Sequence, residues 1–208
     1  MPVPMSNNVK KHAELAVWVN EERLSQGVAG VVFADRDGTL IEHEHYLSDP
    51  DRVFLVPGVA DAIKRLLDQN YAFFLHTNQS GVGRGYFSMD DVFACHSRML
   101  EQIGITEDEL GGWCIAPESP ASDVLYRKPS PRFIDEVAEH NEAGKFNCHM
   151  IGDSLSDLQT AWNAGIQAWA VTSGVNSIDY FEDLVSHSAD FSIQLDFAKC
   201  VDLILQSA

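Results

Sequence analysis

The sequence predicts an α/β domain built on a parallel β-sheet. Short apolar runs alternate along the chain with amphipathic stretches, which is the pattern of β-α-β units. The chain has 208 residues, enough for the core of one such domain. Hydrophobic residues make up 45% and charged residues 22%, which are the proportions of an ordinary folded protein.

Five apolar runs are expected to be strands, because each is short and is followed by polar or glycine-containing residues. They are residues 31–34, 71–76, 113–116, 148–152 and 168–172.

Amphipathic segments between these runs predict helices, and several carry a start signal. Ser88 with Asp91, and Ser154 with Asp157, have the spacing of a capping box in which Asp replaces Glu. Ser130 precedes a proline suited to the first helical position. The expected helices are 59–69, 89–103, 131–141 and 155–164, with a C-terminal helix at about 197–206 on the sheet edge.

A further amphipathic helix is expected at residues 9–26, ahead of the first strand. We therefore divide the chain into an N-terminal helical extension, residues 1–28, and a main domain, residues 29–208.

Charge and composition limit the partners. The formal net charge is −17, and such an excess of acid repels nucleic acids and anionic lipid surfaces. The four cysteines are scattered, as expected for reduced thiols, and no apolar run approaches the roughly 20 residues of a membrane span. With no signal peptide recognised, the sequence predicts a cytoplasmic protein without nucleic-acid or membrane partners; its oligomeric state stays open.

Polar clusters follow the predicted strands. DRDGT (35–39) comes after the first strand, TNQS (77–80) after the second and GDSLSD (152–157) after a later one, while RKP (127–129) precedes a helix. Ligands of open parallel sheets bind outside the carboxyl ends of the strands. We expect the four clusters to converge on one crevice.

Asp35 and Asp37 carry the chemistry of the first cluster. Two carboxylates so close together are costly unless a cation lies between them or one is protonated. Both conditions suit phosphoryl transfer, with Mg²⁺ beside Asp35 as the nucleophile and Asp37, protonated at first, as acid and then base. Gly38 allows a sharp turn. Alone, the pentapeptide also fits a solvated turn or a calcium-binding loop.

Phosphate-binding groups are expected in the TNQS and RKP clusters. The Thr77 hydroxyl and the main-chain N–H of Asn78 would form a neutral phosphate clamp. Lys128 is a point charge able to bridge Asp35 and a phosphate oxygen, and Arg127 has the fork for a bidentate grip. The ordinary alternative for Thr77 is a polar strand end, and for Arg127 and Lys128 it is a solvated basic surface.

Asp153 lies between a strand and a helix, where it is placed to bind Mg²⁺ together with Asp35. Asp157 has two interpretations: support of catalysis, or helix capping worth on the order of 1 kcal/mol. Arg84 is the best candidate to grip a distal substrate group if a bisphosphate is bound, and Arg52 is a weaker one. His43 and His45 are candidate substrate contacts from a loop, although exposed loop histidines are common.

Together the four motifs, in this order, resemble the haloacid dehalogenase (HAD) superfamily of phosphohydrolases, from about residue 31 to residue 174. The resemblance implies a HAD-type Rossmann-like, three-layer α/β/α fold. It implies Asp35 as nucleophile and Asp37 as acid and base, with Thr77 and Lys128 on the phosphate. Asp35, Asp153 and the main-chain carbonyl of Asp37 would bind Mg²⁺.

The segments ADRDGTLIEHEHYLSDPDRVFLVPGV, TNQSGVGRGYFS and RKPSP resemble more closely the heptose bisphosphate and histidinol-phosphate phosphatases. Only about 40 residues separate the first two motifs, too few for a large cap domain. We expect loops 43–50, 79–86 and 117–126 to roof the pocket.

One departure concerns zinc. Members of that subfamily commonly carry a zinc loop, with Cys-x-His before the lysine motif and Cys-x-Cys directly before RKP. Only Cys114 remains here, with Val124, Leu125 and Tyr126 before RKP. Because one thiolate cannot form a tetrahedral site, we expect no zinc.

The leading hypothesis is therefore a Mg²⁺-dependent phosphatase of carbohydrate metabolism that acts on a sugar phosphate such as heptose 1,7-bisphosphate through an aspartyl-phosphate. Histidinol phosphate or another small metabolite is the alternative substrate. A polynucleotide-end phosphatase is disfavoured by the charge. A non-catalytic phosphate-binding module is disfavoured because all the expected catalytic residues are present.

Overall fold

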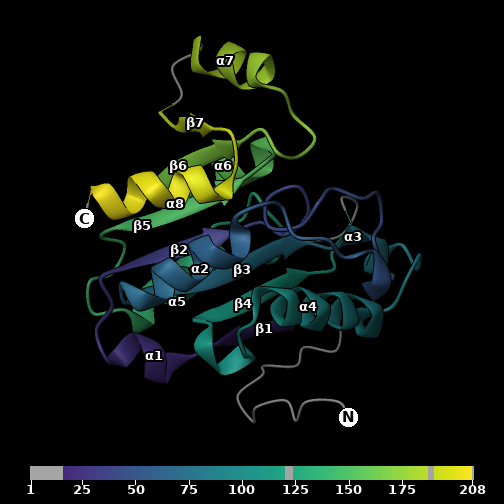
Figure 1. The fold of residues 1–208 in the computed structure, drawn as a ribbon, viewed down its shortest axis with the longest axis horizontal. Helices are drawn as coiled ribbons and strands as arrows, with labels where there is room; N and C mark the ends of the chain where they lie inside the picture. The colour runs from purple at the N-terminus through teal and green to yellow at the C-terminus, as the bar shows by residue number, and fades with distance from the viewer. Residues whose placement is uncertain (1–15, 120–123, 187–189, 208) are drawn as a thin grey trace.

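The computed structural model describes residues 16–119, 124–186 and 190–207, which contain one seven-stranded sheet (Figure 1). Its strand order is β1-β4-β3-β2-β5-β6-β7, and every pair is parallel except β1 with β4. The strands are β1 (Ala16–Val19), β2 (Gly30–Ala34), β3 (Tyr71–Asn78), β4 (Gly112–Ala116), β5 (Cys148–Gly152), β6 (Gln167–Val171) and β7 (Ser192–Gln194).

Helices cover both faces of the sheet, which confirms the predicted α/β/α layering. One face packs on α2 (Val59–Asp68), α4 (Met89–Ile103) and α8 (Phe197–Gln206). The other packs on α1 (Glu21–Ser25), α5 (Arg132–His140), α6 (Leu155–Ala164) and α7 (Ile178–Ser186). Short elements complete the described ranges: α3 (Ser80–Gly83) and the 3₁₀ turns Pro50–Arg52 and Glu107–Glu109.

The central strands are buried on both faces, as parallel strands between two helical layers must be. In β2, Val32 belongs to the core under α2 and α4, whereas Phe33 belongs to the opposite core. The Phe33 ring stacks on Phe74 at 5.1 Å and meets Phe133 of α5 edge-on at 5.8 Å. Burial of such side chains contributes about 1.5–3 kcal/mol each.

The expected helix at 9–26 is wrong at residues 16–19, which form strand β1. This AVWV segment pairs with Gly112–Ile115 of β4, and its β-branched and aromatic residues suit a strand. Of the predicted helix, the described residues contain only α1, whose N-cap residue Asn20 accepts the Arg23 main-chain N–H through its side chain at 3.2 Å. Residues 9–15 lie outside the described ranges. The division at residue 28 remains a proposal, although β1 joins the common sheet.

The C-terminal helix also differs from expectation. Helix α8 packs on the face of the sheet beside α2 and not on its edge, because the Phe197 ring packs edge-on against Phe73 at 5.9 Å. An ion pair of 2.8 Å joins Arg65 of α2 to Asp202 of α8. No helix in the described ranges is long and apolar enough to span a bilayer.

Candidate active site

A small pocket opens where strands β2, β3 and β5 end. Because these strands are parallel neighbours, the residues that follow them meet at one edge of the sheet. The pocket has a volume of about 210 Å³. Its lining includes six predicted site residues: Asp35, Asp37, Thr77, Asn78, Lys128 and Asp153. His43, Ser154, Ser156 and Val175 complete it.

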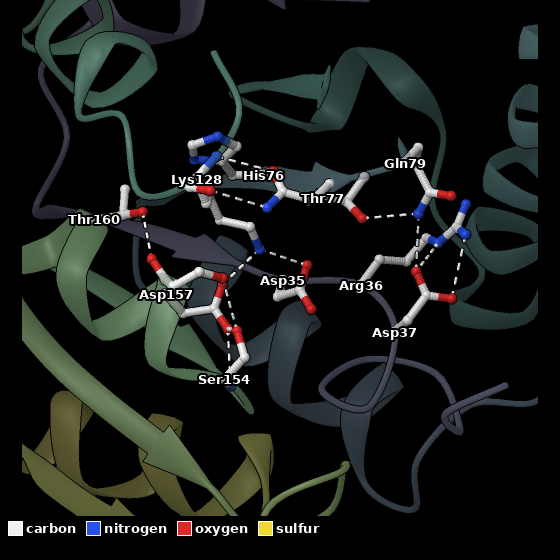
Figure 2. A network of polar contacts seen from close by, with 12 residues as sticks. Asp35, Arg36, Asp37, His76, Thr77, Gln79, Lys128, Ser154, Asp157 and Thr160 are labelled. Atoms are coloured by element: carbon white, nitrogen blue, oxygen red, sulfur yellow. Dashed lines mark hydrogen bonds and ion pairs between the residues drawn. The ribbon is translucent and has the colours of Figure 1, made fainter. Parts of the chain in front are cut away.

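Lys128 is the buried cation that lines the pocket (Figure 2). Its ammonium group donates to Asp35 Oδ1 at 2.6 Å and to Asp157 Oδ1 at 2.5 Å. Burial opposes the charged form, but the carboxylates of Asp157 and Asp35 outweigh it and raise the pKa of Lys128 above its ordinary value. Lys128 therefore remains an ammonium group despite its burial.

Asn78 holds the main chain of Lys128 in place. Asn78 Oδ1 accepts the Lys128 main-chain N–H at 2.9 Å, and Asn78 Nδ2 donates to the Lys128 carbonyl at 3.2 Å. The Asn78 side chain therefore positions Lys128, a role that we did not anticipate from the sequence.

The acidic side chains outnumber this cation. Burial raises the pKa of Asp35 to about 8, with Lys128 opposing the shift and Asp157 and Asp153 adding to it. Burial and the Asp157 charge likewise raise the pKa of Asp153 to about 6. Oxygens of Asp35, Asp153 and Asp157 lie within 4.8 Å of one another. A divalent cation fits this site, because it supplies the missing positive charge and prefers oxygen ligands.

Asp157 caps helix α6 and also contacts Lys128. Its Oδ2 accepts the Ser154 main-chain N–H at 3.0 Å and the Ser154 hydroxyl at 2.6 Å, which completes the predicted capping box of α6. Its Oδ1 accepts from Lys128. Since both oxygens already have donors, Asp35 and Asp153 are the carboxylates left to hold a metal.

Two glycines make room for Asp153. A Cβ added to Gly174 would lie 1.9 Å from Asp153 Oδ2, and one added to Gly38 would lie 2.5 Å from it. The next residue, Val175, donates its main-chain N–H to the same oxygen at 2.9 Å. The loop after β6 therefore fixes Asp153, and the Ser-Gly pair at 173–174 is the sequence signal for it.

Asp37 points toward Arg36 and Gln79 (Figure 2). Arg36 donates to both of its oxygens, at 3.0 and 3.2 Å, and Gln79 Nε2 donates to Oδ2 at 2.9 Å. Gln79 also donates to Thr77 Oγ1 at 3.0 Å. Both Asp37 carboxylate oxygens therefore accept hydrogen bonds, and its role as acid and base stays a prediction. Gln79 was missed at the sequence level, although it lies within the TNQS motif.

Arg84 and Arg127 are not brought into the pocket lining. Arg127 is half-buried; burial lowers its pKa, the Glu118 carboxylate opposes that shift, and the positive charge of Arg84 adds to it. Arg84 is exposed at the end of α3. Arg84 belongs to loop 79–86, and Arg127 directly follows loop 117–126.

Two of the loops expected to roof the pocket contact each other through aromatic rings. In loop 43–50 the Tyr46 ring meets Tyr86, in loop 79–86, edge-on at 4.8 Å. His43 of the first loop lines the pocket, as expected for a substrate contact. Loop 117–126 is described except for residues 120–123.

Cys114 is buried in the core, and burial raises its pKa well above the ordinary value. In the described ranges, the cluster of side chains suited to a metal is Asp35, Asp153 and Asp157. The expectation of no zinc stays a prediction.

Comparisons with known proteins show what the chain is similar to. Residues 125–195 match the family model described as HAD-hydrolase-like. Over 141 residues the chain is 36% identical to a D-glycero-beta-D-manno-heptose-1,7-bisphosphate 7-phosphatase of Rhodopseudomonas palustris, which covers 64% of this chain and 78% of the relative. It is 27% identical over 184 residues to the histidine biosynthesis bifunctional protein HisB of Legionella pneumophila, covering 80% of this chain and 51% of that protein.

A solved structure shows the same similarity. The D,D-heptose 1,7-bisphosphate phosphatase of Bordetella bronchiseptica, complexed with magnesium and phosphate, superposes with a TM-score of 0.73 at 28% identity. The match covers 86% of this chain and 99% of that one.

Proposed function

Because the chain belongs to the HAD superfamily of phosphohydrolases, we propose that it hydrolyses a small sugar phosphate through an aspartyl-phosphate on Asp35. The observation that carries the proposal is the buried contact of Lys128 with Asp35 and Asp157, beside Asp153 at the base of the pocket. A structural ion pair alone does not require three acids around one ammonium group.

Asp35 is the proposed nucleophile. Its carboxylate attacks phosphorus while Lys128 holds it and contacts a phosphate oxygen. The Thr77 hydroxyl and the main-chain N–H of Asn78 bind the other oxygens. When bound by Asp35, Asp153 and the main-chain carbonyl of Asp37, Mg²⁺ supplies the positive charge that lets the phosphate approach these acids.

Asp37 is the proposed acid and base. It gives a proton to the leaving oxygen and later takes one from the water that attacks the phosphoaspartate. To reach the leaving oxygen it must exchange one of its bonds to Arg36 or Gln79.

The pocket volume argues for a small phosphoryl site that leaves the rest of the substrate outside. At about 210 Å³ it is smaller than pockets of roughly 300–1,000 Å³, which enclose drug-sized ligands. A sugar would then lie under the roofing loops. The positive charges of Arg84 and Arg127 act on each other and would suit a second phosphate, and the similarity to the heptose bisphosphate phosphatases supports a heptose 1,7-bisphosphate as the substrate.

Histidinol phosphate is the second candidate, supported by the similarity to HisB. We also propose a cytoplasmic location, supported by four free cysteines that are all buried.

Phosphate release from a panel of esters tests the proposal. The panel contains heptose 1,7-bisphosphate, histidinol phosphate, 4-nitrophenyl phosphate and a 5′-phosphorylated oligonucleotide, each with Mg²⁺ or with EDTA. We expect Mg²⁺-dependent release, fastest from the heptose bisphosphate and absent in Asp35→Asn. Release that survives in Asp35→Asn overturns the mechanism, and preference for the oligonucleotide overturns the substrate class.

A further inference from the structure

We propose that Glu118 is a positioning residue that fixes residues 125–127 and thereby sets where Arg127 presents its guanidinium group. A single oxygen, Glu118 Oε1, accepts three consecutive main-chain N–H groups. The distances are 3.2 Å from Leu125, 2.8 Å from Tyr126 and 3.2 Å from Arg127. Converging main-chain N–H groups form a concave anion site, and here the anion belongs to the chain itself.

Glu118 also holds the Arg127 side chain. The Arg127 guanidinium donates through Nη1 to the main-chain carbonyl of Glu118 at 3.2 Å. The Glu118 charge favours the charged form of this half-buried Arg127, against burial and against the repulsion from Arg84. Both the main chain and the side chain of Arg127 are therefore tied to one residue.

Lys128, the next residue, is held by different groups. Its main chain is bracketed by the Asn78 amide, and its ammonium group by Asp35 and Asp157. Loss of the Glu118 carboxylate should therefore release Arg127 while Lys128 stays in place. Glu118 then affects the binding of a second anionic group and not the phosphoryl transfer at Asp35. This consequence for substrates rests on the proposed function, whereas the anchoring does not.

Three variants separate these roles. Glu118→Ala removes the acceptor. Glu118→Gln keeps an oxygen at the Oε1 position and puts its NH₂ group where Oε2, a buried atom, has no partner. Glu142→Ala is the control, because it removes the same charge from an exposed position.

Hydrogen exchange of the amides of Leu125, Tyr126 and Arg127 tests the anchoring without any substrate. We expect Glu118→Ala to speed their exchange at least about tenfold, since a hydrogen bond to a charged group contributes about 1.5–3 kcal/mol. Glu118→Gln and Glu142→Ala should remain near the wild type. Unchanged exchange in Glu118→Ala overturns the proposal.

Kinetics with two esters test the consequence. For heptose 1,7-bisphosphate, Glu118→Ala should raise KM at least about tenfold, and Glu118→Gln should restore it. For 4-nitrophenyl phosphate, which has no second anionic group, kcat and KM should stay within about twofold. Adding Glu118→Ala to Arg127→Ala should cost little more, because both changes remove the same contact.

Equal loss of activity on both esters would indicate a general structural role and contradict the positioning of Arg127. If the wild type hydrolyses 4-nitrophenyl phosphate but neither hydrolyses nor binds the bisphosphate, the proposed substrate is wrong. The exchange measurement still decides the anchoring in that case.

Discussion

The ammonium group of Lys128 lies 2.6 Å from the carboxylate of Asp35, and both side chains are almost fully withdrawn from solvent. The same ammonium contacts Asp157, so one buried cation serves a cluster of three acids. Because this ammonium group pairs with the proposed nucleophile and is itself buried, we expect the stability of the site and its chemistry to depend on the same residue.

Replacing Lys128 by Met should expose that link. Met keeps an unbranched side chain but leaves Asp35 and Asp157 buried without a counter-ion, so we expect a loss of about 3–5 kcal/mol in the free energy of unfolding at neutral pH. Urea denaturation in EDTA measures it, and phosphatase activity should vanish. Lys199→Met is the control: this exposed lysine pairs with Asp202 at 3.3 Å, and its loss should cost only about 0–1 kcal/mol. Equal stability of the two variants would contradict the account.

Asp37→Asn should distinguish esters by their leaving group. Asparagine cannot donate a proton as an acid does, so kcat for an alkyl sugar phosphate should fall about 10²–10⁴-fold. Hydrolysis of 4-nitrophenyl phosphate should fall much less, because 4-nitrophenolate leaves without a proton. A similar decrease for both esters would argue that Asp37 contributes only to metal binding or folding.

Gly174→Ala should weaken metal binding. Its new Cβ would displace Asp153, so we expect affinity for Mg²⁺ to fall about 10–100-fold, as for other changes behind metal ligands. Titration of activity against Mg²⁺ measures the shift. Gly144→Ala is the control: Gly144 has φ of +60° and nothing within 4 Å of an added Cβ, so the change strains the backbone without touching the site. An unchanged Mg²⁺ requirement in Gly174→Ala would remove Asp153 from the proposed ligands.

The burial of His96 should make the free energy of unfolding depend on pH. Burial lowers the pKa of His96 to about 3, and neither ring nitrogen has a hydrogen-bond partner in the described structure. The unfolded chain takes up a proton below about pH 6.5 and the folded chain does not, so this group removes stability as pH falls from about 6.5 toward 3.

His96→Leu should be neutral or stabilising at pH 7, because an apolar side chain replaces unpartnered polar atoms. Between pH 6 and 4 the free energy of unfolding should fall less steeply in the variant than in the wild type, and the two slopes should differ by about 1.4 kcal/mol per pH unit. Denaturant unfolding across this range checks the slope. Parallel stability curves for the variant and the wild type would show that His96 is already protonated in the fold.

Much of the fold was predictable because its signals are local. The five central strands are apolar runs that are followed by polar residues. Ser88 caps α4 and Ser154 caps α6, as the predicted capping boxes required. Strand β1 was missed because its conformation depends on pairing with β4, far away in the sequence. In isolation, the same segment continues an amphipathic pattern.

Among the site residues, too, those in local motifs were predicted and those that depend on distant contacts were not. Asp35, Asp153 and Lys128 were predicted because each follows a strand or precedes a helix within a compact motif. Gln79 and Glu118 were not, since their importance arises only when loops fold back to bring Asp37 or residues 125–127 within hydrogen-bonding distance. The sequence also does not show that Arg36 turns the Asp37 carboxylate toward itself.

The most direct test of the central claim is to trap the phosphorylated side chain. Enzyme mixed with excess substrate and Mg²⁺, then quenched and reduced with borohydride, should contain homoserine in place of Asp35, since borohydride reduces an acyl phosphate to an alcohol. Peptide mass spectrometry should find homoserine at position 35 alone, and not when EDTA is present. An unmodified Asp35 in enzyme that is turning over, or reduction at another carboxylate, would contradict the claim that Asp35 accepts the phosphoryl group.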